Sequence, residues 1–414
     1  MRQNTTMTSN LIEVHSTYVA GCRISPSGLS VMNQRRWQLN CLYNRALYER
    51  KKIWESEKRG ITYNDQCKWL TGLRKENWME LGEFALGPQR GMLDRLDRAF
   101  KSFFRRVKKG ENPGYPRFRP LSRCVTIDVT KFTQKVIKNR GHWYAVKIKG
   151  FPLIRIRKSR ELPLDRPLKA LRFTLRNGRW ECSAVYALEK THLPANDKTV
   201  GLDLGVRKRV TLSDGTIYPR STRDDRKHRV LQRAISRSKK GSKTRRKRVQ
   251  TYSRFRRRES VRDRNEVHRI TTDIVRNHGT INVEALKIKN MTASAKGTVE
   301  EPGKNVKAKS GLNREILKQN WGLLRDQLKY KAEWAGREYV EIDPRYTSQT
   351  CNRCGERTNP GSSETYRCQT CELVEDRDLN AALNIMTAGD LAVESLTQGI
   401  TPYVDLESCI YSGI

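Results

Sequence analysis

The chain has 414 residues, of which 83 are Lys or Arg and 44 are Asp or Glu, so its formal net charge is +39. A charge this high excludes a neutral metabolic enzyme as the default, because the folded chain would bear its own repulsion without a polyanionic partner. The 8 Trp, 15 Tyr and 9 Phe are too many for a disordered basic tail. The composition therefore predicts a folded protein of two or three domains that binds nucleic acid.

The first part of the chain indicates a short strand followed by helices. Residues 1–17 are polar and are expected to be disordered, and a strand is predicted from Tyr18 to Ile24. Residues 30–112 carry apolar side chains at helical spacing, with basic side chains largely between them. We therefore expect a helical domain over this range.

A β-rich region follows. Residues 113–195 alternate short apolar runs with turns, among them Asn177-Gly178, which is a strong hairpin signal. Together with residues 18–29, this region predicts a small β-barrel that is interrupted by the helical domain.

The second half has a different pattern. Buried strands are predicted at residues 200–206 and 280–284, and each contains or ends in a carboxylate. Between them, residues 226–264 hold eighteen Lys plus Arg and two acids, which predicts a helical hairpin with a dense basic face. A helix over 317–336, a strand over 339–342 and a helix over 378–386 complete the pattern. Residues 391–414 are expected to be a disordered tail.

Four cysteines form two pairs near the C-terminus. Cys351-x2-Cys354 and Cys368-x2-Cys371 are separated by thirteen residues, a spacing that places four thiolates on two tight turns. No apolar run is long enough for a membrane span and no secretory signal is present, so we expect a cytoplasmic, nucleoid-associated protein without a membrane partner. In that reducing compartment the pairs favour a structural Zn²⁺ over a redox dithiol pair.

Three acids share a context that suggests a second metal site. Asp203 and Glu284 end apolar strands and Asp378 opens a helix, in the element order of a ribonuclease-H-like domain. Converging carboxylates can hold two Mg²⁺ ions about 3.5–4 Å apart for phosphodiester hydrolysis. Taken alone, an Asp after an apolar strand is as often a turn cap, and a Glu at a strand end is more often an ordinary solvated or paired residue. Asp376 competes with Asp378, which is preferred here from motif alignment more than from physics.

The motifs resemble those of TnpB proteins, which are transposon-associated, RNA-guided nucleases related to compact type V CRISPR effectors. The resemblance covers roughly residues 18–390, and its C-terminal motif chain is specific. The segments that carry it are Gly201–Gly205, Val283–Met291, Asp343–Gly355, Asp376–Ala382 and, between the helical and β regions, Gly114–Phe118.

The resemblance implies a fold and a reaction. Asp203, Glu284 and Asp378 would be the RuvC nuclease triad, and no triad position is substituted. The chain would be an α/β multidomain protein that cleaves target double-stranded DNA complementary to a guide RNA, next to a short adjacent motif, as a monomeric effector with Mg²⁺ as cofactor. The implied domains are a recognition lobe (30–112), a wedge (18–29 and 113–195), a RuvC nuclease domain (196–345 and 373–390) and an inserted zinc ribbon (346–372).

The basic residues would then line the channel for the guide–target duplex, whose A-form backbone such proteins recognise. Any one of them by itself is more often a solvated surface charge, but the cluster contains few acids. The candidates are Arg95, Arg98, Arg105, Arg106, Arg245, Arg246, Lys247, Arg248, Arg254, Arg256, Arg257 and Arg258.

Other functions remain open from the sequence. The chain could be an RNA-guided DNA-binding protein with weak or no cleavage, although its acids are intact. It could also be a ribonuclease-H-like transposase that acts without a guide. A ribosome-associated basic protein would explain the charge but not the three acids.

Overall fold

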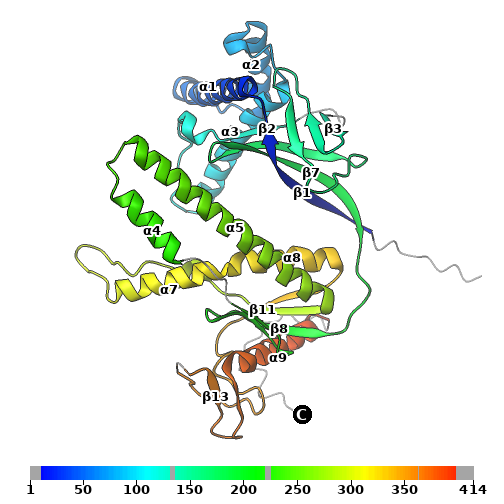
Figure 1. The fold of residues 1–414 in the computed structure, drawn as a ribbon, viewed down its shortest axis with the longest axis vertical. Coiled ribbons are helices and arrows are strands. Elements are labelled where there is room, and N and C mark those ends of the chain that lie inside the picture. Colours follow the sequence, from blue (N-terminus) through cyan, green and yellow to red (C-terminus); the bar gives the residue numbers. More distant parts are fainter. Residues whose placement is uncertain (1–10, 131–135, 220–224, 362, 398–414) are drawn as a thin grey trace, which may run out of the picture. The chain divides into compact units, whose positions relative to one another are not determined.

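The computed structural model describes residues 11–130, 136–219, 225–361 and 363–397 (Figure 1). These belong to two compact units: Glu13–Glu189 forms one, and Lys190–Ile414 with Met1–Ile12 forms the other. The division lies a few residues before the boundary predicted at 195/196. None of the helices in the described part of the chain combines the length and the apolar character of a membrane span.

The first unit contains a seven-stranded half-barrel sheet with the order β2-β6-β7-β1-β5-β4-β3. The hydrogen-bonded order of the described strands runs from β2 to β3 without closing, so the predicted barrel is a half-barrel. Asn177 and Gly178 both have positive φ and form the predicted hairpin turn between β6 and β7. The strands are β1 (Leu11–Arg23), β2 (Thr126–Val129), β3 (Ile137–Arg140), β4 (Trp143–Val146), β5 (Ile154–Arg157), β6 (Leu168–Arg176) and β7 (Arg179–Thr191).

Two strands of this sheet depart from the sequence prediction. β1 begins at Leu11, so the expectation that residues 1–17 are disordered is wrong for Leu11–Thr17. β3 was not predicted, because three of its four side chains are exposed and it therefore lacks an apolar pattern. A strand that gains its stability from pairing with β4 leaves little trace in its own sequence.

Helices pack against the half-barrel as the helical insert. The long helices are α1 (Pro26–Glu57), α2 (Tyr63–Lys75) and α3 (Leu86–Lys108), with short 3₁₀ turns η1 (Trp78–Glu80) and η2 (Leu121–Arg123). Ser25 caps α1 ahead of Pro26, and Thr62 with Asp65 forms a capping box on α2.

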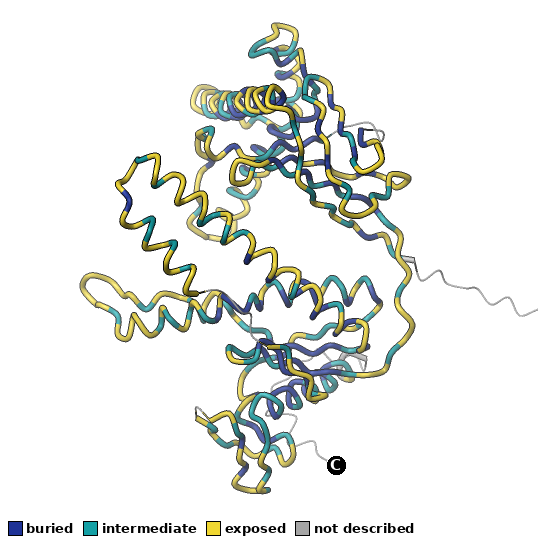
Figure 2. The backbone as a smooth tube through the Cα atoms, viewed as in Figure 1, coloured by how far each residue is buried: buried dark blue, intermediate teal, exposed yellow. Residues whose placement is uncertain are grey.

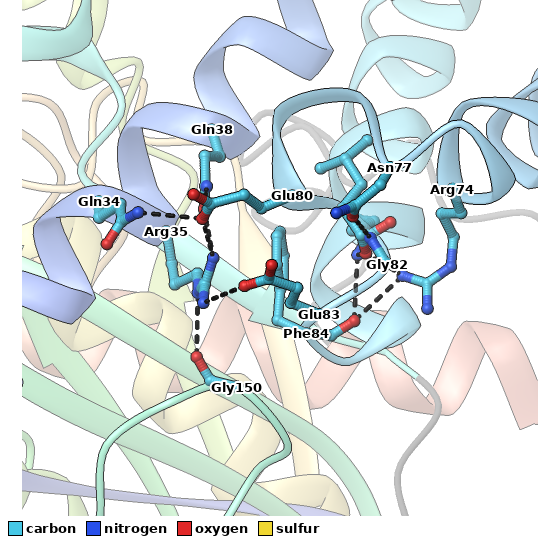
Figure 3. Close-up of polar contacts among 12 residues, drawn as sticks. Gln34, Arg35, Gln38, Arg74, Asn77, Glu80, Gly82, Glu83, Phe84 and Gly150 are labelled. Carbon is cyan, nitrogen blue, oxygen red and sulfur yellow. Dashed lines mark hydrogen bonds and ion pairs between the residues drawn. The ribbon is translucent and has the colours of Figure 1, made fainter.

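A polar network joins the helical insert to the sheet loops (Figure 3). The Glu80 carboxylate accepts hydrogen bonds from Gln34, Arg35 and Gln38 of α1. The Nε of Arg35 donates to the carbonyl of Gly150, in the loop that leads to β5. The insert and the half-barrel therefore share contacts and one apolar core.

The second unit is built on a five-stranded sheet with the order β10-β9-β8-β11-β12. β8 pairs antiparallel with β9 and parallel with β11, and β11 pairs parallel with β12. Apolar side chains of β8 and β11 pack with α5 and α8 on one face, and α9 packs on β8 and β11. The strands are β8 (Thr199–Asp203), β9 (Lys208–Leu212), β10 (Ile217–Pro219), β11 (Thr280–Glu284) and β12 (Glu338–Ile342).

The helices of this unit are mostly as predicted, with two corrections. The helix predicted over 317–336 is two helices, because Asn320 adopts a left-handed φ of 57° between α7 and α8. α9 continues to Thr397 with Ala392 buried, so the tail predicted to be disordered from 391 is helical over its first residues. The bounds are α4 (Asp225–Ser236), α5 (Lys243–Asn277), α6 (Ile288–Met291), α7 (Val306–Gln319), α8 (Trp321–Ala335) and α9 (Arg377–Thr397).

Exposure differs along the α4–α5 hairpin (Figure 2). α4 has no buried residue, and the buried residues of α5 begin only at Glu259. The half of α5 that precedes Glu259 therefore presents its many Arg and Lys side chains largely to solvent.

Candidate metal centre and nucleic-acid interface

The four cysteines of the two pairs converge between β12 and α9. All four Sγ atoms lie within 4.8 Å of one another, and the Cys351–Cys371 and Cys354–Cys368 pairs are each 3.6 Å apart. Tetrahedral Zn²⁺ with Zn–S bonds of about 2.3 Å separates its sulfurs by about 3.8 Å, close to these distances. A small hairpin of β13 (Thr365–Arg367) and β14 (Val374–Asp376) supports the second pair.

Backbone N–H groups shape the turns of both pairs, and at Cys368 they favour the thiolate. Gly355 follows the first pair with φ of 75°, and its N–H donates to the carbonyl of Cys351, which closes a tight turn. A hydrogen bond from the backbone of Cys371 lowers the pKa of the Cys368 thiol to about 6. The cluster could therefore hold a structural zinc ion, with no ligand position left open for chemistry.

The carboxyl ends of two neighbouring parallel strands carry the first two acids. Asp203 is the last residue of β8 and Glu284 the last of β11, and Leu202 pairs with Val283 immediately before them. Because parallel strands end at the same edge of a sheet, the two acids lie side by side there. Glu284 is buried and Asp203 half-buried.

The third acid reaches this edge through α9, which crosses the sheet closely. A Cβ on Gly201 of β8 would lie 2.0 Å from the carbonyl oxygen of Ala382 in α9, so only glycine allows this approach. Asp378 is the second residue of α9. The negative charges of Glu284 and Asp378 both act to raise the pKa of Asp203.

The three acids form an electrostatically unfavourable cluster. Burial, followed by the charges of Glu284 and Asp378, raises the pKa of Asp203 well above its usual value. Burial also raises the pKa of Glu284, although a hydrogen bond from Thr347 opposes this. Acids of one sign near each other favour a bound cation, and their oxygen donors are of the type that Mg²⁺ prefers.

Sequence reasoning missed the side chains that hold this cluster together. The hydroxyl of Thr347, which follows β12, donates to Oε1 of Glu284. The Nδ2 of Asn384 in α9 donates to the carbonyls of Thr347 and Thr350. Asn380 donates to the carbonyl of Thr350 and accepts from the N–H of Asn352, between the first two cysteines. Thr347 and Asn380 lie inside the motif segments, and this position is the sequence feature that could have identified them as functional residues.

Asp376, which competed with Asp378 for the role of the third acid, has a definite place at the start of α9. In the structure its Oδ1 accepts from the N–H groups of Asp378 and Leu379, so it caps α9. Its Oδ2 lies 2.5 Å from the Lys208 ammonium, which is also 3.4 Å from Oδ2 of Asp378. The two aspartates are therefore linked through one lysine of β9.

The basic candidates divide into exposed and internally bonded side chains. Arg95 pairs with Asp128 in the first unit, and Arg245 and Arg248 donate to carbonyls at the end of α4. These three side chains have structural partners. Arg98 is exposed and pairs with Asp94. Arg256 approaches Glu259 at 4.0 Å, and Arg257 also has an interaction. The exposed candidates outside these pairs are Arg105, Arg106, Arg246, Lys247, Arg254 and Arg258.

Comparisons with known proteins agree with the motifs. Residues 183–295 match a family model described as "Probable transposase", and residues 321–385 match "Cas12f1-like, TNB domain". A solved structure, "Cryo-EM structure of the Cas12f1-sgRNA-target DNA complex", has a TM-score of 0.57 at 14% identity, over 91% of this chain and 99% of that chain. At this identity the likeness shows a shared fold.

Two curated relatives are similar along most of their length. The chain is 33% identical over 380 residues to "Putative RNA-guided DNA endonuclease InsQ" of Escherichia coli K12, covering 89% of this chain and 91% of the relative. It is 32% identical over 369 residues to "Putative RNA-guided DNA endonuclease" of Streptomyces pristinaespiralis, covering 87% and 86%. The chain therefore belongs to the TnpB family, as its motifs indicated.

Proposed function

We propose that this chain is an RNA-guided DNA endonuclease whose catalytic residues are Asp203, Glu284 and Asp378. The observation that carries the proposal is that Asp203 and Glu284 end two neighbouring parallel strands, with Asp378 of α9 near enough for its charge to act on Asp203. The names of the two relatives support the same activity, and so does the structural neighbour, a complex of Cas12f1 with sgRNA and target DNA.

The chain's own residues prepare the site for a phosphodiester. Asp203, Glu284 and Asp378 would hold Mg²⁺, which supplies an activated water and stabilises the leaving oxygen when two ions are bound. Thr347 orients Glu284, and Lys208 restrains Asp378. The cysteine ribbon, with Zn²⁺ bound, would fix the start of α9 through Asn380 and Asn384. The ribbon thus positions an acid rather than acting on the substrate.

Domain roles follow from the same proposal. Residues 196–345 and 373–390 would form the RuvC-like nuclease domain, and 346–372 the zinc ribbon. Residues 30–112 would be the recognition lobe, and 18–29 with 113–195 the wedge that grips the guide RNA. The exposed stripe Arg246, Arg254 and Arg258 recurs every four or eight residues on α5, which places these side chains on one helix face for phosphate contacts.

The test begins with the RNA that copurifies with the protein expressed from its own locus. One abundant structured RNA with a variable segment is the expected result, and it supplies the guide for a cleavage assay. Asp203→Ala should abolish Mg²⁺-dependent cutting, whereas Asp197→Ala, at an exposed acid, should not. Ca²⁺ should support binding without cutting. Cleavage by Asp203→Ala at the normal rate, or only heterogeneous bound nucleic acid, would contradict the proposal.

A further inference from the structure

Five aromatic rings gather in the first unit where α3 ends and the next segment begins. Phe103 is 5.2 Å from both Phe104 and Tyr115, and Phe100 is 5.6 Å from Tyr115, measured between ring centroids. Phe100 is buried, but Phe104, Tyr115 and Phe118 are 56%, 41% and 52% exposed. We name Phe104, Tyr115 and Phe118 the aromatic platform. Three large apolar rings facing solvent in one place are unusual on a chain this polar, and such a patch indicates a binding surface.

The platform is held in place by the helix beside it. The carbonyl of Arg119 accepts hydrogen bonds from Asn40 and Asn44 of α1, and its N–H donates to Oδ1 of Asn44. The Arg119 guanidinium lies 4.3 Å over the ring of Tyr43. These contacts fix the segment that carries Tyr115 and Phe118. The rings therefore have a set orientation before any partner arrives, which lowers the entropy cost of binding.

Positive charge accompanies the rings. The Lys51 ammonium lies 5.3 Å over the Tyr115 ring and 5.0 Å over the Phe118 ring. A hollow of about 550 Å³ is lined by Lys51, Tyr115, Phe118 and the exposed Arg117. The end of α3 adds the exposed Arg105, Arg106, Lys108 and Lys109. Acids also lie in this region, among them Glu55, whose charge acts on Tyr115, and Asp97, which pairs with Arg50 and Lys101.

We propose that the aromatic platform binds unpaired nucleotides, with bases stacked on Tyr115 and Phe118 and phosphates near Lys51 and Arg117. This inference rests on the proposed function for its ligand class, nucleic acid. Flat rings beside cations match the two parts of a nucleotide, and base stacking is tolerant of sequence. Paired bases present only their edges, so a strand end, bulge or single strand is the occupant. Its source is either the guide RNA or a separated DNA strand.

The experiment uses the full chain after bound nucleic acid has been removed in high salt. Its affinity is measured for a hairpin with an unpaired overhang, made once in RNA and once in DNA, and for the same hairpin with a blunt end. Phe118→Ala and Tyr115→Ala should each weaken overhang binding about tenfold, and blunt-end binding much less. Phe118→Trp, which keeps a stacking surface, should retain the affinity.

Salt separates stacking from simple charge. Raising the salt concentration weakens all binding because it weakens the phosphate contacts. The ratio of the overhang affinities of the wild type and Phe118→Ala should nevertheless persist. Trp37→Ala is the matched control, because Trp37 is 47% exposed and lies on α1 about 21 Å along the axis from Lys51. It should leave the affinity unchanged. Equal circular dichroism melting curves for each variant and the wild type would show that the fold is kept. Phe118 is the safer of the two sites to substitute because its ring lies at the surface.

Each outcome has a definite meaning. A loss confined to RNA assigns the platform to the guide, and a loss confined to DNA assigns it to a separated strand. Equal losses on both assign it to unpaired bases of either. Overhang affinities unchanged by both alanine variants, or an equal loss on the blunt hairpin, would overturn the inference. If the wild-type protein binds none of the probes, the proposed function itself fails.

Discussion

The Thr347 hydroxyl donates a hydrogen bond of 2.5 Å to Oε1 of Glu284, across 63 residues of sequence. Both side chains are buried. Thr347 is the second residue of the proposed ribbon (346–372), and Glu284 ends β11, the strand beside β8. The bond therefore couples the start of the ribbon to one carboxylate of the proposed catalytic cluster.

Removing that hydroxyl should impair cleavage. Thr347→Val leaves one oxygen of a buried carboxylate without its donor, which costs about 1.5–3 kcal/mol and should slow single-turnover cleavage about tenfold to a hundredfold. Thr347→Ser keeps the donor and should cleave nearly as fast as the wild type. Equal rates for the Val and wild-type proteins would show that the bond does not position Glu284.

Asp376 and Asp378 should separate into a structural and a catalytic acid. Asp378→Asn should reduce cleavage at least a hundredfold, because the amide is a poor Mg²⁺ ligand. Asp376→Asn should change cleavage less than about threefold, since Asn still caps the helix. A plasmid-cleavage assay of the two variants decides the assignment, and a reversed pattern would make Asp376 the third acid.

Loss of the proposed zinc ion should impair cleavage, because α9 connects the cysteine ribbon to the acid cluster. Cys354→Ser should lower the zinc content measured by mass spectrometry, and cleavage should fall because Asn380 and Asn384 lose their fixed acceptors. Cys41→Ser removes a thiol in the first unit and should change neither the zinc content nor the cleavage rate. Full activity in zinc-depleted Cys354→Ser protein would show that the ribbon is dispensable.

The close approach of α9 to β8 makes Gly201 sensitive to substitution. Gly201→Ala places a methyl group 2.0 Å from the Ala382 carbonyl oxygen, and overpacking of this kind costs about 1–3 kcal/mol. Gly311→Ala, in α7 with no heavy atom within 4 Å, should instead stabilise the protein by up to about 1 kcal/mol. Urea unfolding of both variants measures the difference, and equal effects would contradict the packing argument.

Lys331 should give the second unit a characteristic pH dependence. Its ammonium donates to the hydroxyls of Thr271 and Thr272 and to the carbonyl of His268, but burial lowers its pKa to about 8 from 10.5. The folded state therefore binds fewer protons than the unfolded state between pH 8 and 10.5. The cost of burying this charge is present below pH 8 and disappears as the pH rises through that window.

The matched variant for this test is Lys331→Met, which lacks the titrating group. The free energy of unfolding of the wild type should rise relative to Lys331→Met between pH 8 and 10.5, by less than the roughly 3 kcal/mol that full burial would give. Urea unfolding at both pH values checks this. If the difference in the free energy of unfolding stayed constant or fell over this pH range, the pKa of Lys331 would not be lowered in the folded protein.

The sequence was most informative where local pattern and chemistry coincide. Asp203 and Glu284 follow short, largely apolar segments that predicted buried strands, and the structure places both acids at strand ends. The cysteine spacing predicted four converging thiolates, and the structure brings their sulfurs together. Both patterns depend on neighbours in sequence, which is why sequence reasoning reached them.

Sequence patterns did not predict contacts between residues that lie far apart along the chain. Nothing in the residues around Thr347 shows that its acceptor lies 63 positions earlier, and Lys208 meets Asp376 only because β9 folds beside β8. Arg95 was predicted to contact nucleic acid because it lies on a basic helix, but it pairs with Asp128 of the sheet. The break at Asn320 was hidden because apolar periodicity continues across it. Tertiary contacts decided each of these cases.

The order of the parts along the chain has a consequence for synthesis. The basic helices α4 and α5 precede β11, and Asp378 comes after the last ribbon cysteine. A nascent chain therefore displays its cationic helices while its acid cluster is still incomplete. During translation the protein would gain the ability to hold a polyanion well before the ability to cut one.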